Sequence, residues 1–220
     1  MSWTDLDPGQ VDAVVLDLGG VVLSWAFGKY RKATEDFPPQ LMDVAWETRL
    51  GLSPGEMTRL LWDSELHRRA EKGELKFEDF WPMVGKKLNL GEDGLAELFD
   101  DYWSICCVRP DVKDAIRLLR RNYRVGALSN AWSNARTEVS RRYALDELFD
   151  FLVISAEFGA AKPDHSIYME ALRQTGSPAS RVVYVDDVRE NVHAAASAGF
   201  IAIQSTTDEQ LLNILMRLNS

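Results

Sequence analysis

Residues 13–21, Ala-Val-Val-Leu-Asp-Leu-Gly-Gly-Val, decide the fold of this chain of 220 residues. Four apolar residues, two of them β-branched, lead up to Asp17, and two glycines come shortly after it. A short apolar run of this kind predicts a strand buried on both faces, and such strands occur in parallel sheets. Asp17 then lies at the carboxyl end of the strand, where open α/β sheets bind their ligands. Taken by itself, Asp17 equally fits a residue that caps the following turn.

From residue 109 onward, short apolar strands alternate with amphipathic helices. The predicted strands are residues 125–128, 151–154, 182–185 and 201–203. Thr207 and Gln210 predict the capping box of a last helix. Strands separated by single helices indicate right-handed crossovers and one parallel sheet. The expected fold class is therefore α/β, with a Rossmann-like, doubly wound parallel sheet.

Residues 27–103 carry apolar side chains at intervals of three and four, which predicts helices. Turns between these helices are indicated by Pro38-Pro39, Gly51, Ser53-Pro54-Gly55, Gly73 and Gly91. Ser53 with Glu56 behind it predicts a helix start. Because this block follows the first strand directly, it is an insertion into the α/β fold. We expect a core domain of residues 1–24 and 105–220 and a helical cap domain of residues 25–104.

Four of the seven tryptophans lie in the helical block: Trp46, Trp62, Trp81 and Trp103. A tryptophan-rich helical face is more often packing than a ligand site, although large rings at a domain boundary also suit a substrate pocket. Candidates for side chains that select the substrate are Trp25, Phe27, Tyr30 and Trp46.

The chain is acidic, with a formal net charge of −9 at pH 7 and a pI near 4.9. Proteins that bind nucleic acid need clustered cations that displace counterions from the phosphates. Nucleic acid is therefore not an expected partner. Two arginine clusters, in residues 117–124 and 136–142, are expected to be solvated faces of helices.

No stretch of the sequence approaches the ~20 apolar residues of a membrane span, and no apolar segment follows a basic start. A membrane is therefore not an expected partner either. Adjacent cysteines rarely form a disulfide, so Cys106 and Cys107 are expected to be free, buried thiols. Free thiols are typical of a reducing compartment, and we expect a cytoplasmic protein.

Polar side chains end or follow the other predicted strands: Ser129, Asn130, Lys162, Asp186 and Asp187. The carboxyl ends of parallel strands meet at one edge of the sheet, so these groups are expected to converge on Asp17. A carboxylate nucleophile, a hydroxyl, a cation and further carboxylates outline a site for phosphate and Mg²⁺. Two aspartates and one backbone carbonyl are ligands that Mg²⁺ accepts.

With these motifs the chain resembles members of the haloacid dehalogenase superfamily, in particular the subfamily IA hydrolases with a helical C1 cap after the first strand. The motifs are Asp17-Leu18-Gly19-Gly20-Val21, Ser129-Asn130, Lys162-Pro163 and Asp186-Asp187, the last followed by Asn191. The resemblance implies a phosphatase in which Asp17 forms an aspartyl-phosphate. It further implies that Ser129 and the backbone of Asn130 hold the phosphoryl oxygens and that Lys162 neutralises charge around them.

By the same resemblance, Mg²⁺ is the cofactor and binds to Asp17, the carbonyl of Gly19 and Asp187, with Asp186 beside it. The opening Asp-Leu-Gly with this cap is similar to a branch of the family that includes a sugar-1-phosphate phosphatase. The expected substrate is therefore a small phosphorylated metabolite, with a sugar phosphate as the first hypothesis.

The chain departs from the family pattern at Gly19, where family phosphatases usually carry a second Asp that protonates the leaving group. A general acid contributes ~10² to 10⁴ in rate, so its loss weakens catalysis without abolishing it, because positioning of the phosphoryl group carries most of phosphoryl transfer. His67, in the helical block, is the first candidate for a replacement acid, and His165 and His193 are expected to be surface or packing residues.

Two alternatives to the phosphatase remain open. A dehalogenase uses the same nucleophile without a metal, but the pair Asp186-Asp187 would then repel an anionic substrate. A pseudophosphatase that binds a phosphorylated ligand or a partner without turnover is compatible with Gly19.

Overall fold

The computed structural model describes residues 4, 6–24, 38–105 and 107–220. The expectations for Trp25, Phe27, Tyr30 and Cys106 lie outside the described residues. Cys107 is free and half-buried.

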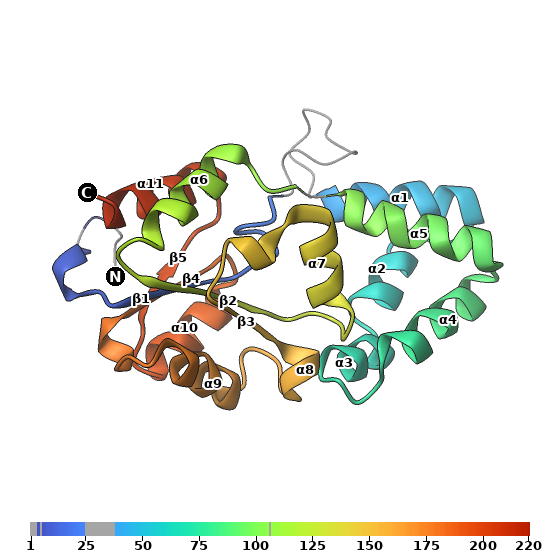
Figure 1. The fold of residues 1–220 in the computed structure, drawn as a ribbon. Coiled ribbons are helices and arrows are strands. Elements are labelled where there is room, and N and C mark those ends of the chain that lie inside the picture. Colours follow the sequence, from blue (N-terminus) through green and yellow to red (C-terminus); the bar gives the residue numbers. More distant parts are fainter. Residues whose placement is uncertain (1–3, 5, 25–37, 106) are drawn as a thin grey trace.

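Five parallel strands form one sheet in the order β3-β2-β1-β4-β5. Their bounds are β1 Ala13–Leu16, β2 Arg124–Ser129, β3 Phe151–Ile154, β4 Val182–Asp186 and β5 Ile201–Gln204. Helices cover both faces of the sheet, with α6 and α11 on one side and α9 and α10 on the other (Figure 1). The doubly wound α/β fold predicted from the sequence is confirmed.

The central position of β1 explains its uniformly apolar sequence. Val14 and Leu16 pack in the layer that contains α6 (Pro110–Leu119) and α11 (Asp208–Leu218). Ala13 and Val15 pack in the opposite layer, with α9 (His165–Thr175) and α10 (Arg189–Ser197). Because both faces of the strand are covered, no position on it is left for a polar side chain.

The remaining helices of the core follow β2 and β3. They are α7 (Ala135–Tyr143) and the short α8 (Ser155–Phe158), and the single-turn 3-10 helices are Pro8–Gln10, Leu145–Glu147 and Ala179–Arg181. In α11 the predicted capping contact is present, since the Gln210 N–H donates to the Thr207 side chain.

The structure moves several predicted element boundaries. Ser129 and Asp186 are the last residues of their strands, one residue beyond the predicted ends. The helix expected from Pro163 begins at His165 and is capped by the Asp164 side chain, after a cis peptide bond at Lys162-Pro163. Ser53 does not cap α2, which begins at Glu56 after Gly55. Instead, the Ser53 N–H donates to the Glu56 carboxylate.

The described residues between β1 and α6 form five helices: α1 Pro38–Leu50, α2 Glu56–Leu61, α3 Glu65–Glu71, α4 Phe77–Leu88 and α5 Glu92–Ser104. They enclose an apolar cluster of their own, in which Trp46, Trp81 and Phe80 are buried. In Figure 1 this helical block lies beyond the carboxyl ends of β2 and β3. The division into a core domain and a cap domain at residues 24/25 and 104/105 stays a prediction.

The core contributes one large side chain to the helical block. Trp132, from the loop after β2, is 3 % exposed and lies within the apolar cluster of the block. Its ring centroid is 4.9 Å from that of Tyr102 and 5.0 Å from that of Phe80. At a second contact the Gly73 Cα lies so close to the core that an added Cβ would be 2.0 Å from the carbonyl oxygen of Ala156 in α8.

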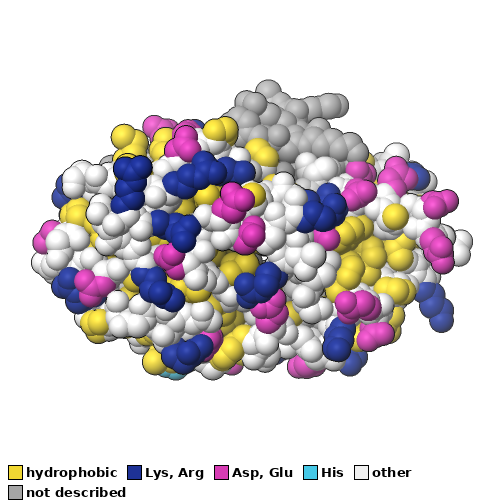
Figure 2. Space-filling view, in the orientation of Figure 1, with side chains coloured by type: hydrophobic (Ala, Val, Ile, Leu, Met, Phe, Trp, Pro, Cys, Tyr) yellow, Lys and Arg dark blue, Asp and Glu magenta, His cyan; other side chains and the backbone are white. Residues whose placement is uncertain are grey.

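The arginine clusters are paired with carboxylates. Arg117 contacts Asp114, Arg120 contacts Asp150, Arg136 contacts Glu157, and Arg141 and Arg142 share Glu138. On the face shown in Figure 2, basic and acidic side chains alternate over the surface. Paired charges of this kind do not form the cationic stripe that binds phosphate backbones. Among the described residues, no helix is both long and apolar enough to span a bilayer.

Candidate active site

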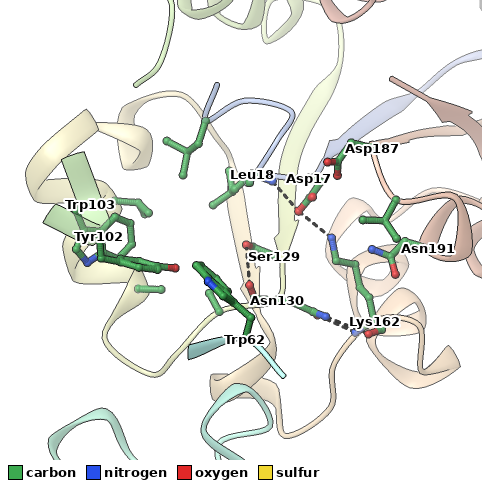
Figure 3. A pocket seen from close by; sticks show the side chains of 16 residues that line it. Asp17, Leu18, Trp62, Tyr102, Trp103, Ser129, Asn130, Lys162, Asp187 and Asn191 are labelled. Carbon is green, nitrogen blue, oxygen red and sulfur yellow. Dashed lines mark hydrogen bonds and ion pairs between the residues drawn. The ribbon is translucent and has the colours of Figure 1, made fainter. Parts of the chain in front are cut away.

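The side chains expected to form the site meet at the carboxyl ends of the three central strands. In the register of the sheet, Leu16 of β1 pairs with Ala127 of β2 and with Val185 of β4, so these strands end side by side. A pocket of about 270 Å³ opens there, and Asp17, Ser129, Asn130, Lys162 and Asp187 line it (Figure 3). The expected convergence of these residues is therefore present.

Asp17 is held in place by hydrogen bonds of its backbone and of its side chain. Its N–H donates to the Val185 carbonyl, and its Oδ1 accepts from the Leu18 N–H at 2.7 Å. The same oxygen lies 2.7 Å from Lys162 Nζ. Burial raises the pKa of Asp17 to about 7; the Lys162 cation opposes this rise, and the carboxylates of Asp186 and Asp187 add to it.

Lys162 is a buried cation with two anionic partners. Its Nζ is 2.7 Å from Asp17 and 2.8 Å from Asp186, and it also donates to the Leu128 carbonyl. Burial alone would lower the pKa of Lys162, but the two carboxylates outweigh burial and raise it. The ammonium group is therefore charged and fixed beside the Asp17 carboxylate.

The Asn130 side chain positions Lys162 through its backbone. The amide Nδ2 of Asn130 donates to the Lys162 carbonyl at 3.0 Å, and the Lys162 N–H donates to Asn130 Oδ1 at 2.8 Å. Two hydrogen bonds of opposite direction between the same two residues fix the distance between the loops after β2 and β3. From the sequence, only the backbone of Asn130 is expected to hold the phosphoryl oxygens, and no local pattern predicts this side-chain contact.

The Asp186 carboxylate is fully buried and accepts from several donors. Oδ1 accepts from the Val188 N–H, and Oδ2 accepts from Lys162 and from the Tyr184 hydroxyl. The Asn191 amide donates to both oxygens at 3.2 Å. The pKa of Asp186 is lowered, because Lys162 and these hydrogen bonds outweigh the effect of burial. This carboxylate is engaged within the protein and holds Lys162 in place.

Asp187 differs from its neighbour because it is only half-buried and lines the pocket. Burial, followed by the charge of Asp186, raises its pKa. Single carboxylate oxygens of Asp17, Asp186 and Asp187 lie within 4.8 Å of one another. Hard oxygen ligands at this spacing fit Mg²⁺, which is bound in proteins through a few carboxylates and retained waters.

The loop after Asp17 turns sharply and brings Gly19 to the pocket wall. The Leu18 carbonyl accepts from the N–H groups of Val21 and Leu23. In this turn the positive φ belongs to Gly20, at 79°. Gly19 therefore contributes backbone, and no side chain, to the wall beside Asp17.

An apolar wall faces the charged groups across the pocket. It includes Leu23, Trp62, Tyr102, Trp103 and Val139, whereas Val188 lines the pocket next to Asp187, where its N–H donates to Asp186. Figure 3 shows Trp62, Tyr102 and Trp103 on one side and Asp17, Asp187 and Lys162 on the other, with Ser129 and Asn130 between them. Of the four tryptophans in the helical block, Trp62 and Trp103 line the pocket, and Trp46 is buried elsewhere with its indole N–H on Asp101.

His67 lies in an adjoining cavity with both ring nitrogens facing a partner. Its Nδ1 accepts from the Trp132 indole N–H at 3.3 Å, and its Nε2 lies 3.6 Å from the Glu71 carboxylate. With one ring nitrogen on Trp132 and the other toward Glu71, neither nitrogen is left to face Asp17. His67 is a packing residue in this structure.

A family model for haloacid dehalogenase-like hydrolases matches residues 11–199. The chain belongs to this family. The match covers strands β1 to β4, the helical block and all the site residues described above. The expectation of a hydrolase of the haloacid dehalogenase type is confirmed, and phosphatases are prominent among its relatives.

This hydrolase is similar to a sesquiterpene phosphatase of Aspergillus oryzae, with 25% identity over 88% of this chain and 89% of the relative. It is 35% identical to a pyrimidine 5'-nucleotidase of Escherichia coli over a shorter match, 48% of each chain. Its fold is also that of a haloacid dehalogenase family enzyme from Bacteroides thetaiotaomicron solved with magnesium and inorganic phosphate. The TM-score is 0.68 at 17% identity over 88% of this chain and 93% of that one.

Proposed function

We propose that this hydrolase is a Mg²⁺-dependent phosphatase of a small phosphorylated metabolite and that it acts through an aspartyl-phosphate on Asp17. The observation that carries the proposal is the contact of Asp17 with Lys162 at the floor of a pocket that also presents Asp187. A buried carboxylate beside a fixed cation is suited to attack an anionic phosphoryl group, because the cation offsets the repulsion between the two anions.

In the first step an oxygen of Asp17 forms a bond to phosphorus while the bond between phosphorus and the leaving oxygen breaks. In the second step water attacks the phosphorus and releases phosphate, and the carboxylate is regenerated. Ser129 and the backbone of Asn130 hold the phosphoryl oxygens, and Lys162 offsets their charge. Asp17, Asp187 and the carbonyl of Gly19 would hold Mg²⁺, which supplies positive charge at the phosphoryl group when bound.

Two features favour a phosphatase over a dehalogenase. The three carboxylates within 4.8 Å of one another face one buried ammonium group, so a carboxylate substrate would meet an excess of negative charge without a metal. The sesquiterpene phosphatase and the pyrimidine 5'-nucleotidase to which the chain is similar are, by their names, enzymes that release phosphate. In the proposed enzyme, residues 25–104 act as a cap that covers the phosphate site.

The experiment that tests this function is Asp17→Asn in an assay with acetyl phosphate and an aryl phosphate, with Mg²⁺ or with EDTA. Asparagine has the shape of aspartate and cannot attack phosphorus, so kcat is expected to fall by about 10⁴-fold or more, as for other lost nucleophiles. Intact mass spectrometry of acid-quenched wild type should detect one added phosphoryl group, absent in the variant.

The matched control is Asp146→Asn, an exposed acid outside the pocket, which should retain full activity. Turnover that persists in Asp17→Asn would place the nucleophile elsewhere. Turnover that EDTA leaves unchanged would contradict the metal dependence, and halide release without metal would identify a dehalogenase.

A further inference from the structure

We propose that the substrate is a phosphate monoester of a compact, uncharged, apolar alcohol, a class different from the sugar phosphate first expected. This inference rests on the proposed phosphatase function, because it concerns the part of the substrate that departs with the leaving oxygen. The structural basis is a pocket with a charged end and an apolar end.

The charged end can hold a single phosphoryl group. It presents Asp17, Ser129, Asn130, Lys162 and Asp187 around the ends of β1, β2 and β4. In Figure 3, Asp17, Lys162 and Asp187 lie on one side of the pocket, and Ser129 and Asn130 lie toward its middle. Once the phosphoryl group is bound there, the rest of a monoester must extend toward the opposite wall.

That opposite wall consists of aromatic and aliphatic side chains. The ring of Trp62 lies 5.4 Å from that of Tyr102, which in turn lies 5.4 Å from the ring of Trp103. Leu23 and Val139 add aliphatic side chains to the pocket lining. Rings at these distances form a continuous apolar surface, and apolar groups that leave water to contact it are stabilised by about 25 cal/mol per Å².

The charges of the pocket argue against a second anionic group on the substrate. Among the described residues that line the pocket, Lys162 is the one Lys or Arg, and its ammonium already contacts two carboxylates. Within this described part of the lining, a carboxylate or second phosphate on the leaving group would find no further Lys or Arg as a partner. Buried charges without a partner are strongly disfavoured.

The same wall disfavours a sugar. A hydroxyl that leaves water without a new hydrogen bond loses free energy. Aliphatic side chains such as Leu23 and Val139 offer it none. Among the described residues, the polar side-chain atoms of this wall are limited to the Tyr102 hydroxyl and the indole N–H groups of Trp62 and Trp103. An apolar group of the same size loses no hydrogen bond. The pocket, at about 270 Å³, is close to the lower limit of ~300–1,000 Å³ for small-molecule sites, so the leaving group is compact, of about the size of one ring.

The first test compares benzyl phosphate with glycerol phosphate. Both are monoesters of primary alcohols, so the comparison depends on the chemistry of the leaving group more than on its acidity. We expect kcat/KM for benzyl phosphate to exceed that for glycerol phosphate by about 10-fold or more, the range that hydrophobic contacts give in enzyme pockets. Phosphoglycolate, which carries a second negative charge, should be the poorest of the three substrates.

Trp62→Ala tests the wall itself. We expect kcat/KM for benzyl phosphate to fall by about 10-fold or more, a larger loss than for acetyl phosphate, whose leaving group is too short to reach the ring. Met83→Ala is the matched control, since Met83 is an exposed apolar residue of the same helical block and does not line the pocket. It should leave both substrates unaffected.

A binding measurement separates this inference from the proposed function. Phenethylphosphonate and dihydroxybutylphosphonate correspond to the two esters, and the enzyme can hydrolyse neither of them. Calorimetric titration in the presence of Mg²⁺ measures their affinities, and we expect phenethylphosphonate to bind more tightly. Hydrolysis of acetyl phosphate without a preference for apolar esters or phosphonates would overturn the inference alone. Tighter phenethylphosphonate binding without any turnover would support the inference and contradict the phosphatase. Failure of both readouts would overturn both.

Discussion

Gly19 limits the rate of the proposed reaction, because it has no side chain that could act as an acid. Its position is the one at which a second aspartate is expected from the family pattern, and it contributes only backbone to the pocket wall. His67 does not replace the missing acid, because its two nitrogens face Trp132 and Glu71. The leaving oxygen must therefore depart without a proton from either of these positions.

Gly19→Asp is accordingly expected to restore an acid. The backbone permits the change, since the positive φ of this turn belongs to Gly20. Hydrolysis of alkyl phosphates should rise by a large part of the ~10² to 10⁴ that a general acid supplies. Aryl phosphates, whose leaving oxygens need little help, should change little. The measurement is a series of monoesters of graded leaving-group acidity on both proteins, after thermal melts have shown that both are folded.

A wild-type rate that is independent of leaving-group acidity would contradict the interpretation of Gly19. It would mean that another group already donates the proton.

Asp186 and Asp187 are neighbours with different environments, and metal binding should distinguish them. Asp187 is half-buried at the pocket, whereas Asp186 is engaged by Lys162, Tyr184 and Asn191. Mg²⁺ should stabilise the wild type, by about 2.7 kcal/mol when it is present at 100 times its Kd. Asp187→Ala should remove most of this stabilisation.

Thermal melts with Mg²⁺ titrated against EDTA provide the measurement, and Asp146→Asn should behave as the wild type does. An equal shift of the melting temperature in Asp187→Ala and in the wild type would remove Asp187 from the metal site.

At the scale of elements, the strand ends could be predicted from the sequence and the loop contacts could not. An apolar run leads up to each of Asp17, Ser129 and Asp186. Because the strands are parallel, their carboxyl ends lie at the same edge of the sheet. The contact between the Asn130 amide and Lys162 depends on how two loops are placed, and no local pattern encodes that. For the same reason the sequence did not separate Trp62, at the pocket, from Trp46, in the interior.

Helix α1 contains a carboxyl group that makes its packing sensitive to pH. Asp43 is 2 % exposed, and its Oδ2 accepts from the Thr58 hydroxyl of α2. The pKa of Asp43 is raised to about 6, mainly by burial. The hydrogen bond from Thr58 opposes the rise, and the charge of the nearby Glu47 contributes to it. The folded state then holds the proton more tightly than the unfolded state does. This group therefore lowers the stability progressively between about pH 4 and pH 6.

Asp43→Asn should remove this pH dependence, because asparagine keeps an oxygen for Thr58 and has no charge to bury. The variant should gain up to about 2 kcal/mol in unfolding free energy over the wild type as the pH rises from about 4 to about 7. Urea unfolding at several pH values measures the difference. Asp63→Asn, at an exposed position of the same helical block, is the control. A constant difference for Asp43→Asn across this range would contradict the expectation.

For the whole molecule, the position of the helical block against the core depends on one close backbone contact. Gly73 has a φ of 72°, and a Cβ there would lie 2.0 Å from the Ala156 carbonyl oxygen of the core. Gly51 has a φ of 67° with no atom within 4 Å of its Cβ position. Alanine at either site meets the strain of a left-handed backbone, but only Gly73→Ala also forces the block away from α8.

We therefore expect Gly73→Ala to lower the unfolding free energy by about 1–3 kcal/mol more than Gly51→Ala does, the usual range for overpacking. Denaturant unfolding of both variants measures the difference. Equal losses in the two variants would show that the contact between the helical block and the core has no role in stability.

Trp132 affects the timing of turnover. Its indole belongs to the core chain, three residues after Ser129, and is buried in the helical block with its N–H on His67. A hinge motion that lifts the block from the sheet must first withdraw this ring, at a free energy comparable to the ~3–5 kcal/mol lost when a buried Trp is truncated. A step with that added barrier is slower by roughly a hundredfold or more. In the proposed phosphatase, this contact would therefore slow any opening of the pocket that lifts the whole block, whereas rearrangement of side chains at the pocket mouth leaves the ring in place.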